Sequence, residues 1–342
     1  FNAIVTGYYF KDEHYRQTME MLSRYGMPVH LEYMMADNSV FGNFGARDKG
    51  NKHFIDLGNK NARNRVRRTV QHRAETLSQF GIAAYAASEE IGLGVDETCF
   101  HPAVQYLFGK WCEEKYGTVD KLNLAWGTKY SSFGNVKGIL IADVLKKSPE
   151  HPGQWIDFRM FMEEMYNSLM EKEYFGAFQK KAPGSAAGYN AGPYVDVPTQ
   201  GLNAARLGKT INYSCEYLPG FLGFNMTLSS FDMLSSRKIP YLYSVVGYPN
   251  AYQKTDANYD FRIWYTLLHG GRGNAWFSTY DDDWYSKFTD DGSPGGTMKM
   301  IAENSADALN GLGKFIIEAK KEVRSGIYYS RRSRYFSHSS IG

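Results

Sequence analysis

The chain has 342 residues, of which 43% are hydrophobic, 15% aromatic and 22% charged, and its 39 Lys plus Arg against 36 Asp plus Glu leave a formal net charge of +3. This is the composition of an ordinary soluble globular protein, and no apolar run approaches the roughly 18 residues that a membrane-spanning helix needs. The charges are spread along the chain rather than gathered into basic blocks, which excludes the electrostatic footprint of a nucleic-acid-binding protein.

Short apolar or aromatic runs alternate with amphipathic stretches of helical period, a pattern typical of βαβ units and a parallel sheet. We predict seven strands, over residues 3–10, 28–35, 82–88, 186–190, 211–216, 239–246 and 273–280. Helices are predicted over 14–25, 62–80, 158–180 and 225–236. Gly26 and Gly81 stand where two of these helices end, just before a strand, which supports both boundaries.

An open doubly wound sheet and a (β/α)8 TIM barrel both fit this alternation. No GxGxxG or GxxxxGK[ST] motif follows any predicted strand, which removes the nucleotide-binding version of the open sheet and favours the barrel. A barrel has eight strands, so either the first strand lies upstream of Phe1 or one strand is missing from this count.

The predicted domain organisation places the barrel at residues 1–322. Residues 95–155 are too long for a simple loop and contain a predicted helix at 102–116, so we expect an excursion or subdomain after the strand at 82–88. The strand-like residues 326–330 predict that 323–342 begin a following domain, and the chain reads as a piece of a longer protein. No targeting segment is found, and an extracellular or periplasmic location is slightly favoured over a cytoplasmic one.

Active sites of such barrels lie at the carboxyl ends of the strands, and four of the seven predicted ends hold carboxylates. In chain order these ends hold Tyr8 and Tyr9; Glu32, Tyr33 and Asp37; Glu89 and Glu90; Tyr189 and Asn190; Glu216 and Tyr217; Tyr248 and Asn250; and Tyr280, Asp281, Asp282, Asp283 and Trp284. Glycosidic bond cleavage needs one carboxylic acid to protonate the leaving oxygen and one carboxylate to attack or to activate water, with rings that hold the sugar.

The pair Glu89-Glu90 is the sharpest feature, because it directly follows a strand of small residues. Adjacent strand residues point to opposite sides, so at most one of the two faces the barrel centre, and a solvated acidic turn is the alternative interpretation. For the run from Asp281 to Asp283, solvation is favoured over cation or substrate binding. His30 and His269 lie in apolar segments, where packing is favoured over ligation.

The segment from Glu113 to Thr128 (EEKYGTVDKLNLAWGT) resembles one that is characteristic of family 42 glycoside hydrolases, which are (β/α)8 barrel β-galactosidases. In that family the segment follows an Asn-Glu-Tyr-Gly motif whose Glu is the general acid/base, and residues 89–92 (EEIG) stand in that place. The resemblance therefore implies that Glu90 is the acid/base. It extends over 269–277 and 326–330, and it implies a homo-oligomer formed through the domain that follows the barrel.

The chain also departs from that family. Glu89 replaces the family's Asn, and the place of the nucleophile, in the strand that opens at Pro240, is held by Val245 or a near neighbour, none of them acidic. Of the family's metal ligands only Cys99 and His101 have ligand-capable counterparts, whereas a zinc site needs about four, so no metal and no cofactor are predicted. The three cysteines, Cys99, Cys112 and Cys215, fit no disulfide framework.

If Glu90 is the acid, Glu216 is the first candidate for the second catalytic carboxylate, with Asp281, Asp282 and Asp256 in reserve. A displaced carboxylate favours the ~6.5 to 9.5 Å separation of inverting enzymes over the ~5 to 5.5 Å of retaining ones. The expected substrate-binding residues are Glu89, Tyr85, Asn190, Trp276, Tyr280, Asp281 and Trp284. The sequence thus predicts a hydrolase that acts on a β-galactoside or a related oligo- or polysaccharide; the alternatives are an inactive barrel that binds glycans and a structural barrel.

Overall fold

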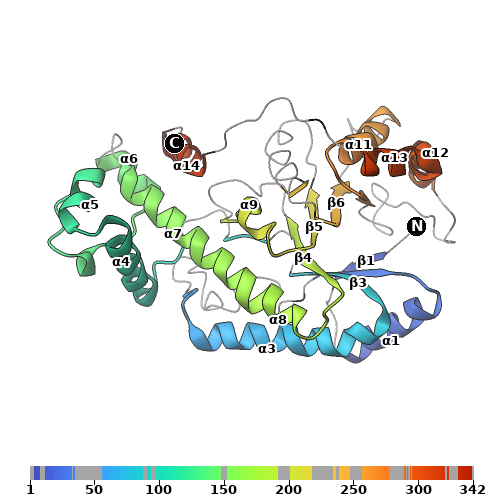
Figure 1. Ribbon diagram of the computed structural model, residues 1–342, viewed down its shortest axis with the longest axis horizontal. Helices are drawn as coiled ribbons and strands as arrows, with labels where there is room; N and C mark the ends of the chain where they lie inside the picture. The colour runs from blue at the N-terminus through green and yellow to red at the C-terminus, as the bar shows by residue number, and fades with distance from the viewer. Residues whose placement is uncertain are drawn as a thin grey trace.

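The computed structural model describes residues 4–7, 12–32, 34, 56–87, 91–93, 98–147, 152–191, 201–217, 234–235, 239–246, 256–276, 289, 291, 293, 295–319, 322 and 330–340. Its centre is a curled sheet in which seven parallel strands pair in chain order (Figure 1). These strands are β1 (Ile4–Gly7), β2 (Val29–Glu32), β3 (Ile82–Ala86), β4 (Ala186–Ala191), β5 (Tyr213–Tyr217), β6 (Tyr241–Val246) and β7 (Gly273–Trp276). Each lies within or overlaps one of the seven predicted runs, so the prediction of a parallel barrel-type sheet is confirmed.

The described helices follow the predicted pattern of alternation. They are α1 (Asp12–Arg24), α3 (Lys60–Leu77), α4 (Pro102–Tyr116), α5 (Val119–Trp126), α6 (Ile141–Lys147), α7 (Gly153–Leu169), α8 (Gly176–Gln179), α9 (Ala204–Leu207), α11 (Asp256–Leu268), α12 (Gly296–Asp307), α13 (Gly313–Glu318) and α14 (Arg331–Ser340). A π-helical turn, Met170–Phe175, joins α7 to α8 without a break. The predicted helix 225–236 lies outside the described residues except at 234–235, as does the predicted strand 326–330 except at its last residue.

The two faces of the sheet bury different side chains, because successive residues of a strand point to opposite sides. On the outer face, residues such as Leu31, Tyr85 and Tyr189 belong to the large apolar core shared with the helices. Figure 1 shows α3 and the long α7–α8 helix running along this side of the strands. On the inner face a second, smaller core contains Ala84, Ala86, Ala186, Tyr213 and Cys215, with Tyr243 and Ala275 packed against it.

Helices α4, α5 and α6 fall within the predicted excursion and lie around the far end of α7, away from the sheet (Figure 1). The side chain of His101 caps α4 by accepting a hydrogen bond from the backbone N–H of Ala103 at 3.3 Å. Helix α4 matches the predicted helix 102–116 and packs through Phe108 against Phe158 of α7, with ring centroids 4.9 Å apart. An aromatic core therefore fastens these helices to α7.

Helix α14 also docks on α7, and ionic contacts reinforce its apolar packing. The Tyr335 ring lies edge-on against Trp155, with centroids 6.0 Å apart, and its hydroxyl donates to Glu163 at 3.0 Å. Arg331 pairs with the same Glu163 carboxylate, and Arg332 reaches the buried Asp157 at 3.0 Å. Residues 331–340 are thus a helix held against α7, and the prediction that 323–342 begin a following domain stays a prediction.

Candidate active site

Three polar side chains from three different strands meet on the inner face of the sheet. Asn190, near the end of β4, donates a hydrogen bond from Nδ2 to the carboxylate of Glu32, the last residue of β2. The hydroxyl of Tyr213 on β5 donates to Oδ1 of the same amide at 2.8 Å. The result is an ordered chain of donors and acceptors that runs from phenol to amide to carboxylate.

An aromatic layer lies beside this chain of hydrogen bonds. The His30 ring packs edge-on against Tyr213 and Tyr243, with centroid separations of 5.5 and 5.2 Å. His30 and Glu32 are two residues apart on β2 and therefore share one face. Burial is the main cause that raises the pKa of Tyr213 well above its usual range, with Cys215 and Glu32 adding to it. The Tyr213 phenol therefore keeps its proton and remains a hydrogen-bond donor.

The side chains of Glu32, Asn190 and Tyr213, with the neighbouring rings of His30 and Tyr243, form what we call the inner array. Close approach of two strands brings this array together. Gly188 lies between Ala186 and Asn190 on β4, and a Cβ atom there would collide with the backbone carbonyl of Tyr213. Because this position has no side chain, β4 and β5 pack closely enough for the Tyr213 hydroxyl to reach Asn190.

Buried His30 makes stability depend on pH. Burial lowers its pKa to about 4, whereas an unfolded histidine titrates near ~6.5. Because the unfolded chain binds this proton more readily, the free energy of unfolding should fall by up to about 3 kcal/mol as the pH drops from ~6.5 to ~4. Urea unfolding at both ends of this window measures the loss, which His30→Gln should reduce. The control, His72→Gln, changes an exposed residue of α3; equal pH slopes for the native protein and His30→Gln would contradict the prediction.

Of the predicted site residues, Asn190 lies in the inner array but Glu216 does not. The Glu216 side chain is fully buried and accepts a hydrogen bond at 2.5 Å from Ser214 on the same strand. Tyr213 and Cys215 face inward, so the alternating Ser214 and Glu216 face the helices. The first sequence candidate for the second catalytic carboxylate, Glu216, therefore lies on the helix-facing side of β5.

The same alternation separates Tyr85 and Trp276 from the inner array, although both were expected to contact sugar. The Tyr85 ring packs against Phe178 of α8 with centroids 4.2 Å apart. Trp276, at the end of β7, packs against Ile301 of α12. Both rings are therefore placed between the sheet and its helices. The inner residue that sequence reasoning left without a role is Glu32, and its spacing of two from His30 is the signal that places both on one face.

The remaining predicted residues, Glu89, Glu90, Tyr280, Asp281 and Trp284, lie outside the described residues.

Of the two metal-ligand counterparts, Cys99 is buried, which raises the pKa of its thiol to about 12, and His101 serves as the cap of α4. Within the described ranges no cluster of three His, Cys, Asp or Glu side chains is arranged to hold a metal ion, and no helix has the length and apolar character to cross a bilayer.

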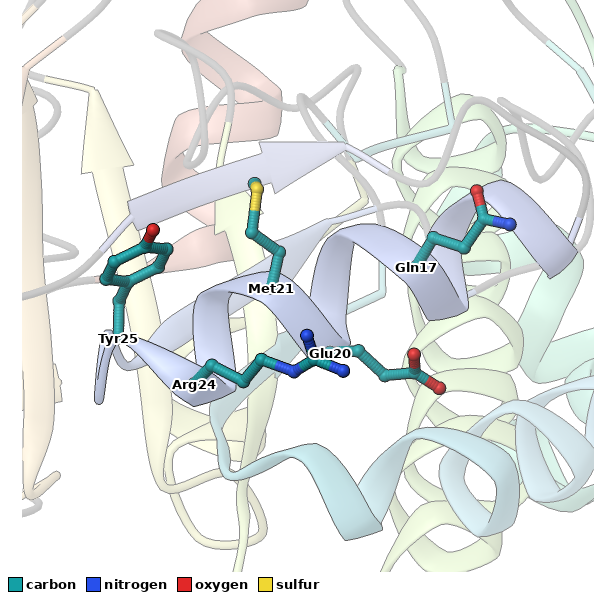
Figure 2. Close-up of a pocket in the computed structure, with 5 residues that line it drawn as sticks. All are labelled: Gln17, Glu20, Met21, Arg24 and Tyr25. Atoms are coloured by element: carbon teal, nitrogen blue, oxygen red, sulfur yellow. The ribbon is translucent and has the colours of Figure 1, made fainter.

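A separate pocket of about 440 Å³ lies on the outer surface of α1 (Figure 2). Its lining residues are Gln17, Glu20, Met21, Arg24 and Tyr25. Arg24 and Tyr25 come shortly before β2, so this part of the pocket lies toward the amino end of that strand, whereas Glu32 and Asn190 lie near the carboxyl ends of theirs. This pocket is therefore distinct from the inner array.

Comparison with known proteins agrees with this architecture. The family model for glycoside hydrolase family 42, described as beta-galactosidase, matches residues 40–216. A beta-galactosidase of an Arthrobacter species is 35% identical over 95 residues, which are 26% of this chain and 13% of that protein.

Solved structures share the fold at low sequence identity. The beta-galactosidase of Halorubrum lacusprofundi is 15% identical, with a TM-score of 0.69 over 97% of this chain and 55% of its own. That of the psychrophilic Marinomonas ef1 is also 15% identical, with a TM-score of 0.68 over 90% of this chain and 54% of its own. The chain thus spans about half the length of these two proteins and a smaller share of the Arthrobacter relative. Because the family model covers more than half of the sequence, this chain belongs to glycoside hydrolase family 42.

Proposed function

We propose that this protein is a glycoside hydrolase that cleaves a β-galactoside, or a related galactose-containing oligo- or polysaccharide, by carboxylate chemistry. The observation that carries the proposal is the match of the family 42 model over residues 40–216. The inner array adds physical support, because a carboxylate and an amide near the carboxyl ends of parallel strands, with aromatic rings on the same face of the sheet, suit a bound sugar.

Glu90 is the general acid in this proposal. Its assignment rests on the sequence, where residues 89–92 occupy the place of the family's acid/base motif. A carboxylic acid in this role donates its proton to the glycosidic oxygen as the bond to the anomeric carbon breaks. On the inner face of the sheet, the Asn190 amide is a group that can hydrogen-bond both a hydroxyl and a carboxylate.

The test is hydrolysis by the full-length protein of a panel that contains β-galactosides, galactans and, as controls, α-galactosides and β-glucosides. We expect release of reducing sugar from one or more β-galactosides or galactans and none from the α-linked controls. Calorimetric binding of the same glycans without turnover of any of them would instead indicate a glycan-binding barrel. Activity confined to β-glucosides would contradict the substrate class while leaving the hydrolase assignment intact.

A further inference from the structure

We propose that Glu32 is the second catalytic carboxylate, facing the side of the anomeric carbon opposite the departing group. This inference rests on the proposed function and deepens it. The strand that opens at Pro240 has no acidic residue at or near Val245, so the nucleophile or base must come from another strand. Glu32 is the described carboxylate that the inner array holds at the carboxyl end of a strand.

Burial and face separate Glu32 from the sequence candidate Glu216. The Glu32 side chain is half-buried at the end of β2, on the same face as the inward-packed His30. Glu216 is completely buried on the helix-facing side of β5, next to Ser214. A carboxylate that reacts with a sugar must be accessible from the inner face of the sheet. Because side chains alternate along a strand, Glu32 meets this requirement and Glu216 does not.

The hydrogen-bond chain also points an amide N–H donor at the Glu32 carboxylate. Tyr213 keeps its proton and donates to Oδ1 of Asn190, which turns the Nδ2 group of the amide toward Glu32. An amide N–H can only donate, so its partner oxygen is an acceptor, and this favours the ionised carboxylate. A nucleophile or a base needs this charged form, whereas the acid Glu90 must carry a proton.

Glu32, Glu90 and one water molecule account for every bond and proton in the reaction. In a retaining reaction, a Glu32 oxygen bonds to the anomeric carbon while the glycosidic C–O bond breaks and the Glu90 proton passes to the leaving oxygen. Water then gives a proton to Glu90, and its oxygen displaces Glu32. In an inverting reaction, Glu32 takes a proton from the attacking water in a single displacement. Both routes place Glu32 on the α side of a β-galactoside.

The experiment compares Glu32→Gln, Glu32→Ala, Glu216→Gln and the surface control Glu75→Gln in the full-length protein, with folding verified by circular dichroism. Glu75 lies on α3 with 64% of its side chain exposed, in an ion pair with Lys181. We expect both Glu32 variants to lose at least about 100-fold in kcat, as the removal of a catalytic carboxylate does. The other two variants should keep kcat within a few-fold per folded molecule.

Rescue by azide distinguishes a carboxylate that reacts with the sugar from a residue that only positions neighbouring side chains. The Glu32→Ala variant is assayed on a nitrophenyl β-galactoside, whose leaving group departs without a proton. Azide should restore turnover by forming a bond to the anomeric carbon from the vacated side, and NMR should identify the product as the α-galactosyl azide. The anomer first released by the native protein then distinguishes retention from inversion.

The outcomes separate this inference from the proposed function. A native protein that is inactive on every glycan overturns the hydrolase assignment. An active native protein whose folded Glu32 variants keep kcat, or lose it without forming the α-azide, overturns the role of Glu32 alone. Loss of kcat in Glu216→Gln with unchanged Glu32→Gln would return the role to Glu216 and overturn the inference.

Discussion

Replacing Glu90 by Gln in the full-length protein should lower kcat for β-galactoside hydrolysis by about 10²- to 10⁴-fold. The amide has nearly the volume of the carboxylic acid but cannot transfer a proton to the glycosidic oxygen. Substrate binding, measured as the dissociation constant by calorimetry, should therefore change much less than kcat. Steady-state kinetics on a disaccharide substrate provide the measurement.

The leaving group supplies an internal control for this prediction. A nitrophenolate departs with little need of protonation, so bond cleavage in a nitrophenyl galactoside should suffer less in Glu90→Gln than cleavage of the disaccharide. Glu89→Gln is the matched neighbour, and it should alter KM without this dependence on the leaving group. Equal losses for both substrates in the Glu90 variant, or full activity on the disaccharide, would show that Glu90 is not the proton donor.

Replacing Asp157 by Ala should destabilise the protein by about 3 to 5 kcal/mol, because it removes a fully buried carboxylate that accepts hydrogen bonds from four side chains. The Asp157 carboxylate is fully buried on α7 and accepts hydrogen bonds from Lys115 at 2.6 Å and Trp126 at 3.1 Å. Tyr116 and Arg332 donate to the same carboxylate. One side chain therefore ties α4, α5 and α14 to α7. Urea denaturation followed by tryptophan fluorescence measures the loss.

Arg332 offers the matched control for this network. Its side chain is 50% exposed, so Arg332→Ala removes one partner from a site that solvent reaches. That variant should lose no more than about 1 kcal/mol, as exposed ion pairs do. Because Arg332 belongs to α14, its loss should still expose residues 331–340 to limited proteolysis earlier than in the native protein. Equal destabilisation by both variants would refute the central position of Asp157 in the network.

The strands and several helices could be predicted from the sequence because their signals are local. A short apolar run between amphipathic stretches already predicts a buried strand, and each of the seven predicted runs overlaps one. Helix α4 was predicted at its observed bounds because Pro102 and Gly117 mark its two ends, by chemistry that involves only neighbouring residues. Asn190 was also placed correctly near a strand end.

The faces of the strands were harder to predict. A list of strand ends treats Asn190 and Glu216 alike, yet a step of one residue reverses the side to which a side chain points. Which alternate set faces inward depends on what each strand meets across the fold. Tyr85 finds Phe178 among the helices, whereas the neighbouring Ala84 and Ala86 face the inner core.

The amino-acid sequence by itself thus determined the family and the parallel sheet, since both depend on local motifs and hydrophobic periodicity. Only the tertiary structure decided that Glu32 meets Asn190, a residue 158 positions away in the chain. This contact follows from the pairing of β2 with β3, which includes a register shift between Val29 and His30, and of β3 with β4. Register is a property of the assembled sheet, because backbone hydrogen bonds between distant strands set it, and no short segment contains that information.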